Sequence, residues 1–466
     1  MIKYDGIVIG SGQAGTPLAR RLAAKGWRVA IIEKQFVGGT CVNVGCTPTK
    51  TLIASGRIAH LARRAADFGV RTGPVEVDIE AVIKRKNGIV LSSRESNTKS
   101  LLETHDLDLI YGTASFTGPR ELTIAKEQGS MTSITADHIF INTGTKPVVP
   151  SISGLQSVQY YDSSTIQNLL EIPRHLVIIG GGYIALEFGQ LYRRLGSEVT
   201  VIDDAPAFLH HEDEDIASEI RKILEEEGIR ILTGVDVMQV SNGNGRISIE
   251  LSGAPTVDED PPGSTTIIGT HLLVAAGRHA DTRALQPEIG GVLLDEHGFI
   301  KVNDRLETSA PGVYALGDVK GGPQFTHISY NDHLVVYKNL IEGGAETISN
   351  RPAIYCLFTD PELGRIGLTE KEARAKGLNI KVACLPAAHI ARAQENGETK
   401  GLVKAIVDAQ SGTILGASVL TQGGGELMSI LQMAMVGAVT YRQIKDMIFA
   451  HPTFAESLNN LFAKID

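Results

Sequence analysis

The stretch Tyr4-Asp5-Gly6-Ile7-Val8-Ile9-Gly10-Ser11-Gly12-Gln13-Ala14-Gly15 begins as a buried strand and runs straight into a glycine loop. Apolar residues then recur at helical spacing from Thr16 to Lys25. A second strand is predicted from Trp27 to Ile32, and Glu33 ends it. Strand, loop, helix and strand in this order predict a βαβ unit.

Each glycine of the loop has a physical role in binding a dinucleotide. Gly10 permits the tight turn, Gly12 lets the backbone approach a pyrophosphate, and Gly15 lets the helix pack closely on the strand. The start of the helix offers free N–H groups and a positive dipole end to the phosphates. Glu33 is placed to accept hydrogen bonds from ribose hydroxyls. The first unit is therefore expected to bind a dinucleotide.

The same order returns later in the chain. A strand predicted from His175 to Ile179 leads into Gly180-Gly181-Gly182-Tyr183-Ile184-Ala185, and a helix is predicted from there to Leu195. The next strand, Glu198 to Ile202, again ends in an acid, Asp203. In both copies the acid lies 23 positions after the first glycine. Two dinucleotide sites in one chain are expected.

Two features of the second loop bear on the choice between NADH and NADPH. Asp203 would repel a 2′-phosphate, and no arginine follows it within the next several residues. The third loop position is Ala185, and alanine there is sometimes associated with NADP. The two features disagree. We expect NADH, with NADPH as the less favoured alternative, because a charge clash costs more than a methyl group.

The rest of the chain shows further organisation. A long helix is predicted from Ile79 to Leu102, followed by short strands up to Pro150. A polar turn is predicted at residues 258–263. Beyond residue 350, strands (401–408 and 413–420) alternate with helices (424–439 and 441–449), which is typical of an α+β domain.

Composition excludes several classes of function. The formal charge is −9, which argues against a nucleic-acid binder, and the run Lys84-Arg85-Lys86 is expected to be a solvated helix face. No apolar stretch approaches the roughly 18 residues of a membrane-spanning helix, and no signal peptide is recognised. We therefore expect no membrane association and a cytoplasmic protein. Four cysteines are too few for a disulfide scaffold.

Two of the cysteines lie close together in Gly38-Gly39-Thr40-Cys41-Val42-Asn43-Val44-Gly45-Cys46-Thr47-Pro48-Thr49-Lys50. Their sulfurs are within reach of a disulfide if the chain between them forms one helical turn. A cysteine near a helix N-terminus also has a lowered pKa. A buried unreactive pair and half of a metal site are the alternatives. No second Cys/His pair at zinc spacing follows, so we expect no metal site.

This cysteine motif resembles the active-site signature of the class I pyridine nucleotide-disulfide oxidoreductases. Further segments resemble that family in the same order along the whole chain: Thr143-Gly144, Ala276-Gly277-Arg278, Leu316-Gly317-Asp318 and His451-Pro452-Thr453-Phe454-Ala455-Glu456. The family includes lipoamide dehydrogenase, glutathione reductase and mercuric reductase. Cys356 and Cys384 lie outside these motifs and are expected to be buried packing residues. His327, His333 and His389 also lack such neighbouring motif residues and are expected to be surface or loop histidines without a catalytic role.

The resemblance implies a role for each catalytic residue. Cys46 is the sulfur nearer the flavin, and Cys41 is the thiol that meets the substrate. Lys50 lies beside the flavin and pairs with Glu187. The resemblance also implies that His451, oriented by Glu456, acts as acid and base on Cys41 from the partner subunit. It therefore implies an obligate homodimer with an active site shared across the interface.

The resemblance further implies FAD in the first site and the nicotinamide nucleotide in the second. The residues expected to bind FAD are Gly10, Gly12, Gly15, Glu33, Gly39, Thr40, Lys50, Ala114, Thr143, Gly144, Asp318 and Thr326. Those expected to bind NAD are Gly180, Gly182, Ala185, Glu187, Asp203 and Gly277.

The implied fold is α/β, with two Rossmann-like dinucleotide-binding domains and a C-terminal α+β dimerisation domain. The expected boundaries are 1–150 for the FAD domain, 151–275 for the NAD(P) domain, 276–345 for a segment that completes the FAD domain, and 346–466 for the dimerisation domain.

The substrate is less determined than the chemistry. The implied relay passes electrons from NADH through FAD to the Cys41–Cys46 disulfide, and on to a small disulfide, thiol-stress or metal-ion substrate. Gln324-Phe325-Thr326 and the His-Pro ending resemble flavoprotein reductases of reactive-chlorine resistance. The chain lacks both the C-terminal cysteine pair of mercuric reductases and the His-Lys-Ala run of lipoamide dehydrogenases. A dihydrolipoamide dehydrogenase and a metal reductase similar to mercuric reductase remain the alternatives.

Overall fold

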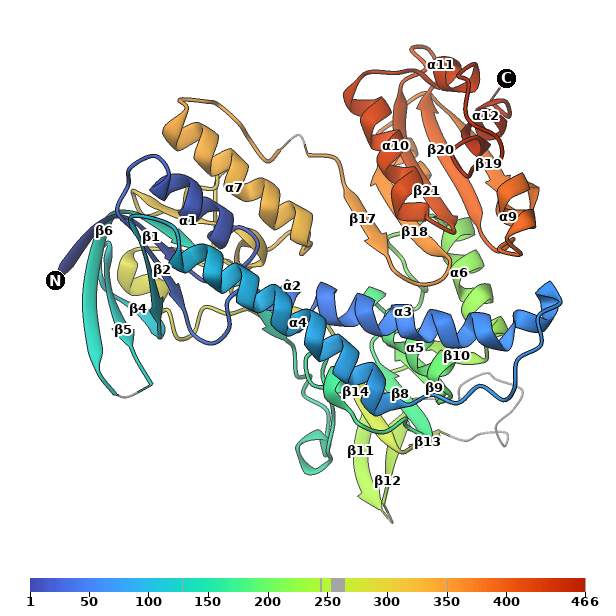
Figure 1. The fold of residues 1–466 in the computed structure, drawn as a ribbon, viewed down its shortest axis with the longest axis horizontal. Coiled ribbons are helices and arrows are strands. Elements are labelled where there is room, and N and C mark those ends of the chain that lie inside the picture. Colours follow the sequence, from blue (N-terminus) through green and yellow to red (C-terminus); the bar gives the residue numbers. More distant parts are fainter. Residues whose placement is uncertain (128, 244, 253–264, 350, 466) are drawn as a thin grey trace.

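The computed structural model describes residues 1–127, 129–243, 245–252, 265–349 and 351–465. Its first sheet has the order β3-β2-β1-β6-β5-β4, with β16 beside β6 (Figure 1). These strands are β1 (Ile2–Ile9), β2 (Val29–Glu33), β3 (Leu107–Tyr111), β4 (Thr113–Gly118), β5 (Glu121–Ala125), β6 (Met131–Ile141) and β16 (Val313–Ala315). Strand β16 pairs in parallel with β6, so the chain returns to the first sheet after the second has been built.

The second sheet is parallel throughout, in the order β10-β9-β8-β14. Its strands are β8 (His175–Ile179), β9 (Glu198–Asp203), β10 (Ile229–Thr233) and β14 (His271–Val274), and a three-stranded sheet lies beside it, with β11 (Val237–Gly243), β12 (Arg246–Leu251) and β13 (Thr266–Gly269). Helices α5 (Tyr183–Leu195) and α6 (Glu214–Glu226) belong to this unit. The short pair β7 (Thr145–Pro147) and β15 (Arg278–Ala280) lies between the two units. The polar turn predicted at 258–263 lies outside the described residues.

The third sheet, in the order β17-β18-β21-β20-β19, is antiparallel. Its elements are β17 (Ile354–Leu357), β18 (Glu362–Gly367), α8 (Glu370–Ala375), β19 (Ile380–Pro386), α9 (Ala391–Glu395), β20 (Leu402–Asp408), β21 (Ile414–Thr421), α10 (Gly424–Val436), α11 (Tyr441–Lys445) and α12 (Ser457–Phe462). The mixed α/β class is as predicted. The expected boundaries at 150, 275 and 345 stay predictions, and each lies outside the strands.

Two predicted helices end earlier than the sequence pattern suggested. Helix α10 stops at Val436 because Gly437 follows and Ala438 has a positive φ of 52°. Helix α11 then begins with a capping box in which Thr440 and Gln443 satisfy each other's backbone N–H groups, and it ends at Lys445 rather than Phe449. Apolar spacing alone extended both helices too far.

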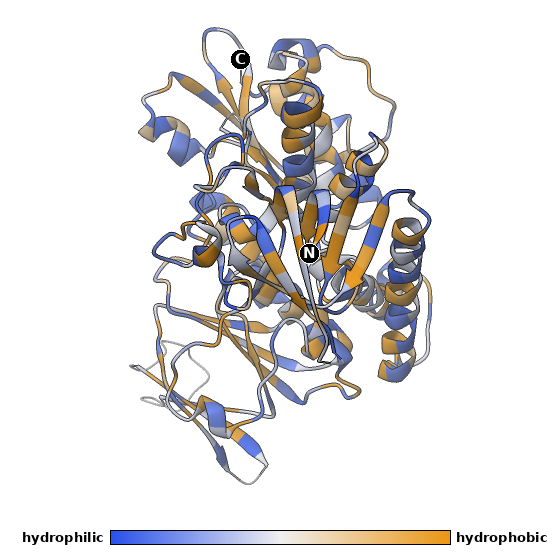
Figure 2. Ribbon diagram, turned by 90° about the vertical axis from the view of Figure 1, so that its left-hand side faces the viewer, coloured by the Kyte–Doolittle hydropathy of each residue, from blue (hydrophilic) through white to orange (hydrophobic). Residues whose placement is uncertain are grey.

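Four longer helices belong to the first unit or lead away from it. Helices α1 (Gly15–Ala23) and α7 (Thr326–Ile341) pack together beside the first sheet, while α3 (Cys46–Arg63) and α4 (Ile79–Leu102) cross from the first unit towards the second (Figure 1). The strands are mainly hydrophobic, and the helices mix hydrophobic with hydrophilic residues (Figure 2). No helix among the described residues is long and apolar enough to cross a membrane.

One prediction about α4 is wrong in part. Lys86 is not on a solvated face: it is buried, and its Nζ donates to Oδ1 of Asn168 at 2.7 Å. Its neighbours Lys84 and Arg85 are exposed, as predicted. Three consecutive charged residues cover most of a helical turn, so one of them, Lys86, faces the interior, where it binds the side-chain amide of Asn168.

A buried ionic cluster joins the second unit to the third. Arg194 on α5 donates to Oδ2 of Asp360 at 2.6 Å and to Oε1 of Glu227 at 2.7 Å. Arg57 on α3 donates to the other oxygen of Asp360 at 2.7 Å. Since these groups are withdrawn from water, each charge depends on its partner.

We therefore expect Arg194→Ala to be strongly destabilising. The substitution leaves Asp360 and Glu227 buried without this partner, so the expected loss is about 3–5 kcal/mol of unfolding free energy. The measurement is urea-induced unfolding followed by fluorescence. The matched control is Arg392→Ala, which removes an exposed helical pair with Glu395 and should change stability by less than about 0.5 kcal/mol. Equal losses in the two variants would contradict the buried cluster's role.

Candidate redox site

The first glycine loop is tightly packed around Asn142. Gly10 has a φ of +101°, and a Cβ there would lie 2.3 Å from the backbone oxygen of Asn142. A Cβ on Gly15 would lie 2.1 Å from the backbone oxygen of Gly10. Gly15 N–H donates to Oδ1 of Asn142, and the amide of Asn142 donates to the backbone oxygen of Leu316, both at 2.9 Å. Asn142 therefore joins three segments, and sequence reasoning missed it.

Glu33 organises the inside of the same loop. Its Oε2 accepts from the backbone N–H of Ser11 at 3.1 Å and from the Ser11 hydroxyl at 2.6 Å. The N–H of Gly38 donates in turn to the Ser11 hydroxyl oxygen at 3.2 Å. Next along the chain, a Cβ on Gly39 would lie only 2.7 Å from Cα of Gly12. The nucleotide loop and the start of the cysteine segment are thus in direct backbone contact.

The residues present fit FAD. The glycine cradle leaves no room for side chains, and the hydroxyl of Thr143, next to the positive-φ Gly144, is buried without a hydrogen-bond partner. Burial raises the pKa of Asp318, whose nearest hydroxyls, Thr145 and Ser329, are 3.5 Å away. A ligand rich in hydroxyls and phosphates would satisfy both side chains. Ala114 on β4 is buried.

The two cysteines lie at a break between two helices. Helix α2 (Gly39–Asn43) carries Thr40 and Cys41, and α3 begins at Cys46. Gly45 makes the close turn possible: a Cβ there would lie 2.8 Å from the backbone oxygen of Thr40. Both sulfurs are free thiols, and they are close enough to share a hydrogen bond. The predicted pair is therefore brought together.

The surroundings make the two thiols unequal. The hydrogen bond with Cys41, the hydrogen bond with Thr326 and the charge of Lys50 together lower the pKa of Cys46 to about 6, against the opposing effect of burial. The hydrogen bond with Cys46 and burial both raise the pKa of Cys41. The Thr326 hydroxyl is 3.1 Å from Sγ of Cys46. The lowered pKa of Cys46, which lies at a helix N-terminus, favours the thiolate form on that sulfur rather than on Cys41.

Lys50 and Glu187 form the predicted ion pair, with Nζ 2.5 Å from Oε2. The backbone N–H of Phe358 donates to the other oxygen of Glu187 at 3.0 Å, and Lys50 Nζ lies 4.5 Å from the centre of the Phe358 ring. The site therefore draws on α3, α5 and the segment after β17. Sequence reasoning did not single out Phe358.

The second glycine loop repeats the first. Gly180 has a φ of +104°, with the backbone oxygen of Ala275 only 2.5 Å from where a Cβ would be. Ala185 is fully buried at the helix–strand contact, and Gly182 has open space around it. The backbone N–H groups of Gly181 and Ala205 donate to Asp203, although burial raises the pKa of that carboxyl. Gly277, also at positive φ, follows β14. This cradle fits a second dinucleotide.

His451 and Glu456 form a pair of their own. Nδ1 of His451 lies 2.9 Å from Oε2 of Glu456, and the His451 side chain is 67% exposed. Within the described part of a single chain, no hydrogen bond or ion pair joins this pair to Cys41, Cys46 or Lys50. The pair is formed as predicted, but one chain does not bring it to the cysteines.

The residues set aside as noncatalytic have varied surroundings. Cys356 and Cys384 are only partly buried, which corrects the expectation of full burial. His333 is completely buried, and His327 Nε2 is 2.7 Å from the backbone oxygen of Ile354. Among the described residues, no group of three or more His, Cys, Asp or Glu side chains is arranged to hold a metal ion.

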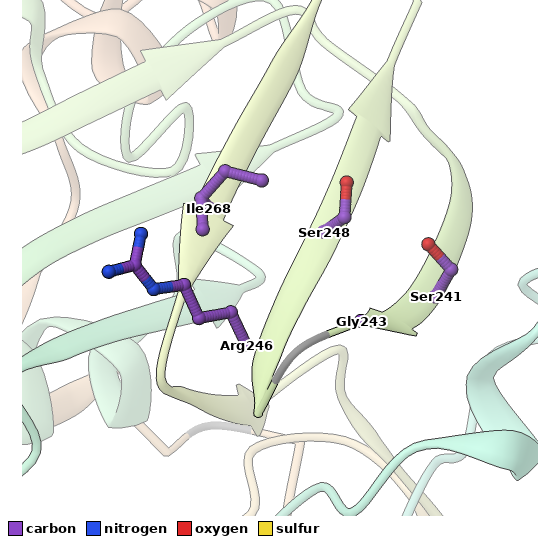
Figure 3. A pocket seen from close by; sticks show the side chains of 5 residues that line it. All are labelled: Ser241, Gly243, Arg246, Ser248 and Ile268. Carbon is purple, nitrogen blue, oxygen red and sulfur yellow. The ribbon is translucent and has the colours of Figure 1, made fainter.

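A shallow pocket lies away from these residues, on the three-stranded sheet (Figure 3). Ser241, Gly243, Arg246, Ser248 and Ile268 line it, from β11, β12 and β13. It contains no thiol, carboxylate or histidine, so it offers no redox chemistry.

Two family models match the chain. The model described as pyridine nucleotide-disulphide oxidoreductase covers residues 4–332, and the dimerisation domain of the same family covers residues 354–462. The chain belongs to the class I pyridine nucleotide-disulfide oxidoreductases. It is accordingly an FAD-dependent enzyme that uses NAD(P)H, and its dimerisation domain indicates a homodimer.

Individual relatives cover nearly the whole chain. The probable pyridine nucleotide-disulfide oxidoreductase RclA of Escherichia coli is 39% identical over 469 residues, 100% of both chains. A dihydrolipoyl dehydrogenase of Thermus scotoductus is 36% identical, covering 98% of this chain and 96% of its own. A mercuric reductase of Staphylococcus aureus is 34% identical, covering 98% of this chain and 81% of its own.

The fold agrees with that of a solved relative. The Cu(II) complex of the HOCl-induced flavoprotein disulfide reductase RclA from Escherichia coli superimposes with a TM-score of 0.90 at 36% identity, covering 100% of both chains. The resemblance to this family stated from sequence is confirmed. The residue roles and the NADH preference stay predictions.

The inequality of the two thiols can be measured. Cys46 should be ionised above about pH 6 and protonated below it, against an ordinary thiol value of 9.0. The measurement is the ultraviolet absorbance of the thiolate in the reduced protein, titrated with pH, with Cys46→Ser identifying the signal. Thr326→Val should move the midpoint to higher pH, because it removes a hydrogen bond to the anion, whereas Thr326→Ser should not. A midpoint near that of an ordinary thiol in the wild type would contradict this assignment.

Proposed function

We propose that this enzyme passes electrons from NADH, through FAD, to a disulfide between Cys41 and Cys46, and that Cys41 then reduces a small disulfide substrate. The observation that carries the proposal is the unequal thiol pair beside the Lys50–Glu187 ion pair. FAD, when bound, supplies the ability to accept a hydride on one side and to release an electron pair on the other.

The residues of this chain divide the work among them. The cation of Lys50 and the hydroxyl of Thr326 hold negative charge on Cys46. Glu187 orients Lys50 through a short ion pair. Cys41, which keeps its proton beside Cys46, requires a base before it can attack a substrate disulfide. The exposed His451, oriented by Glu456, supplies that base.

The base reaches Cys41 across the interface of a homodimer. In one chain the pair of His451 and Glu456 lies apart from the cysteines, while the C-terminal unit exposes large apolar side chains. Met433 and Val436 on α10 are 76% and 83% exposed, and Ile448 is 97% exposed. Such a face requires cover in solution. We expect a second copy of this chain to cover the apolar face, which would bring its His451 to the cysteines of the first copy.

Cu(II) is a second candidate acceptor. The relative RclA has been solved as a Cu(II) complex, and a thiol pair is a ligand set that copper accepts. Cu(II) is proposed here as a substrate, without a resident metal: two Cu(II) ions each accept one electron and become Cu(I), while the Cys41–Cys46 dithiol becomes a disulfide and releases two protons. The cytoplasm, where thiols are kept reduced, is the compartment that suits this chemistry.

The central experiment is an anaerobic titration of the purified yellow protein with NADH and, separately, NADPH. A long-wavelength absorbance band should appear at two electrons per flavin, because the Cys46 thiolate then lies against the flavin. Cys46→Ser should abolish the band, and Cys41→Ser should retain a thiolate but lose disulfide reduction. Faster development with NADH supports the nucleotide preference. Loss of the flavin absorbance without this band would contradict the proposed electron transfer from the flavin to the cysteine pair.

The dimer can be tested apart from the chemistry. Met433→Glu together with Ile448→Glu should place charges in the apolar face and shift the mass measured by light scattering towards that of one chain. Turnover of disulfide should fall with the dimer, while reduction by NADH remains. The control is Leu293→Glu, at an exposed residue outside the C-terminal unit. A dimer that survives in the double variant would show that this face is not the interface.

A further inference from the structure

The segment between the two cysteines contains a backbone carbonyl that the following helix cannot satisfy. Val44 lies in the break between α2 and α3, and in a continued helix its carbonyl would accept from the N–H of residue 48. That residue is Pro48, which has no N–H. The next carbonyl, that of Gly45, accepts from the N–H of Thr49 at 3.1 Å. Val44 therefore needs a donor from outside the helix.

Gln167 supplies that donor from the second unit. It lies in a short 3₁₀ helix, Ile166–Asn168, ahead of β8, and is only 2% exposed. Its Nε2 donates to the backbone oxygen of Val44 at 2.6 Å and also to the backbone oxygen of Ser163. An amide NH₂ group has two hydrogens, and both are used here. The Gln167 amide is thus held between its own turn and the cysteine segment.

The residue before Val44 is held as well. Asn43 accepts at Oδ1 from Nε of Arg94, on α4, at 2.8 Å. Lys86, on the same helix, donates to Asn168, which directly follows Gln167. Helix α4 therefore holds the cysteine segment directly through Arg94, and it also holds the turn that carries Gln167.

We propose that Gln167 is a positioning residue for the thiol chemistry, which fixes the Val44 carbonyl so that the sulfurs of Cys41 and Cys46 stay within bonding reach of each other. The inference rests on the proposed function, in which the pair cycles between disulfide and dithiol. When the dithiol reduces a substrate disulfide, two electrons and two protons pass to the substrate, whose S–S bond breaks as the Cys41–Cys46 bond forms. Cys46 must attack the mixed disulfide on Cys41 to close that bond, and a fixed segment raises the effective concentration of one sulfur at the other.

The test measures how strongly the two sulfurs favour the disulfide. The holoenzyme is equilibrated without oxygen in mixtures of reduced and oxidised dithiothreitol, and the free thiols of Cys41 and Cys46 are trapped by alkylation and counted by mass. Gln167→Met keeps the length of the side chain but removes the donor. It should shift the exchange equilibrium towards the dithiol by about three- to ten-fold, the range expected for one hydrogen bond. Gln167→Asn, one methylene shorter, should do the same by withdrawing the amide from Val44.

The same loosening should appear in the titration of Cys46. The hydrogen bond with Cys41 is the largest cause of its lowered pKa, so a looser segment should move the midpoint of the thiolate absorbance to higher pH. The matched control is Tyr192→Phe, which removes a 2.9 Å bond from a buried hydroxyl to the backbone oxygen of Ile166, in the same short 3₁₀ helix. It should leave both readouts unchanged, because the bond to the cysteine segment remains.

Three results would overturn the role of Gln167: an unchanged equilibrium in its variants, a shift towards the disulfide, or an equal shift in Tyr192→Phe. Either Gln167 variant suffices, so the test stands if one of them does not fold. A wild type whose cysteines form the disulfide, but which gives no long-wavelength band with NADH or NADPH, would instead contradict the proposed electron transfer and leave the role of Gln167 standing.

Discussion

The backbone of Gly12 touches the backbone of Gly39, and the arrangement of the redox site depends on that contact. No side chain fits between the two segments, since a Cβ on Gly39 would lie 2.7 Å from Cα of Gly12. The contact sets the loop that cradles a pyrophosphate against the helix that carries Cys41. Ser11 reinforces it by joining Glu33 to Gly38 through one hydroxyl. Nucleotide binding and thiol placement are therefore fixed by one piece of backbone geometry.

The electrostatics of the site come from segments far apart in the sequence. Lys50 follows the cysteines on α3, Glu187 follows the second glycine loop on α5, and Phe358 lies beyond β17. Their contacts tie all three units to one cation, so the charge that holds the Cys46 thiolate is maintained by the packing of the whole chain. The buried cluster around Arg194 stabilises the same contact between the second and third units, since Arg194 on α5 pairs with Asp360.

Periodic and glycine-rich patterns allowed much of this to be predicted. The spacing of glycines and acids located both βαβ units. The ion pair of Lys50 with Glu187, which only the family resemblance implied, is present. Local patterns did not reveal Asn142, because it is a single polar residue whose partners lie in distant segments. Lys86 was misplaced for a related reason: the sequence shows a charge but not the buried amide of Asn168 that receives it. Helix ends after Val436 and Lys445 depended on backbone caps that apolar spacing does not encode.

His451 also has one partner that is close in sequence and another that is distant. Its bond to Glu456 spans only five residues, so the acid–base pair forms within one chain and is oriented before any partner arrives. The proposed mechanism pairs this base with Cys41, which lies on a different unit, and within the described part of the chain no hydrogen bond or ion pair joins the two. Pre-orientation lowers the entropic cost of assembling the site, because Glu456 already orients the His451 side chain before a partner docks. In the proposed mechanism, the dimer interface separates the thiol from its base, which makes assembly a condition of disulfide turnover without affecting the chemistry upstream.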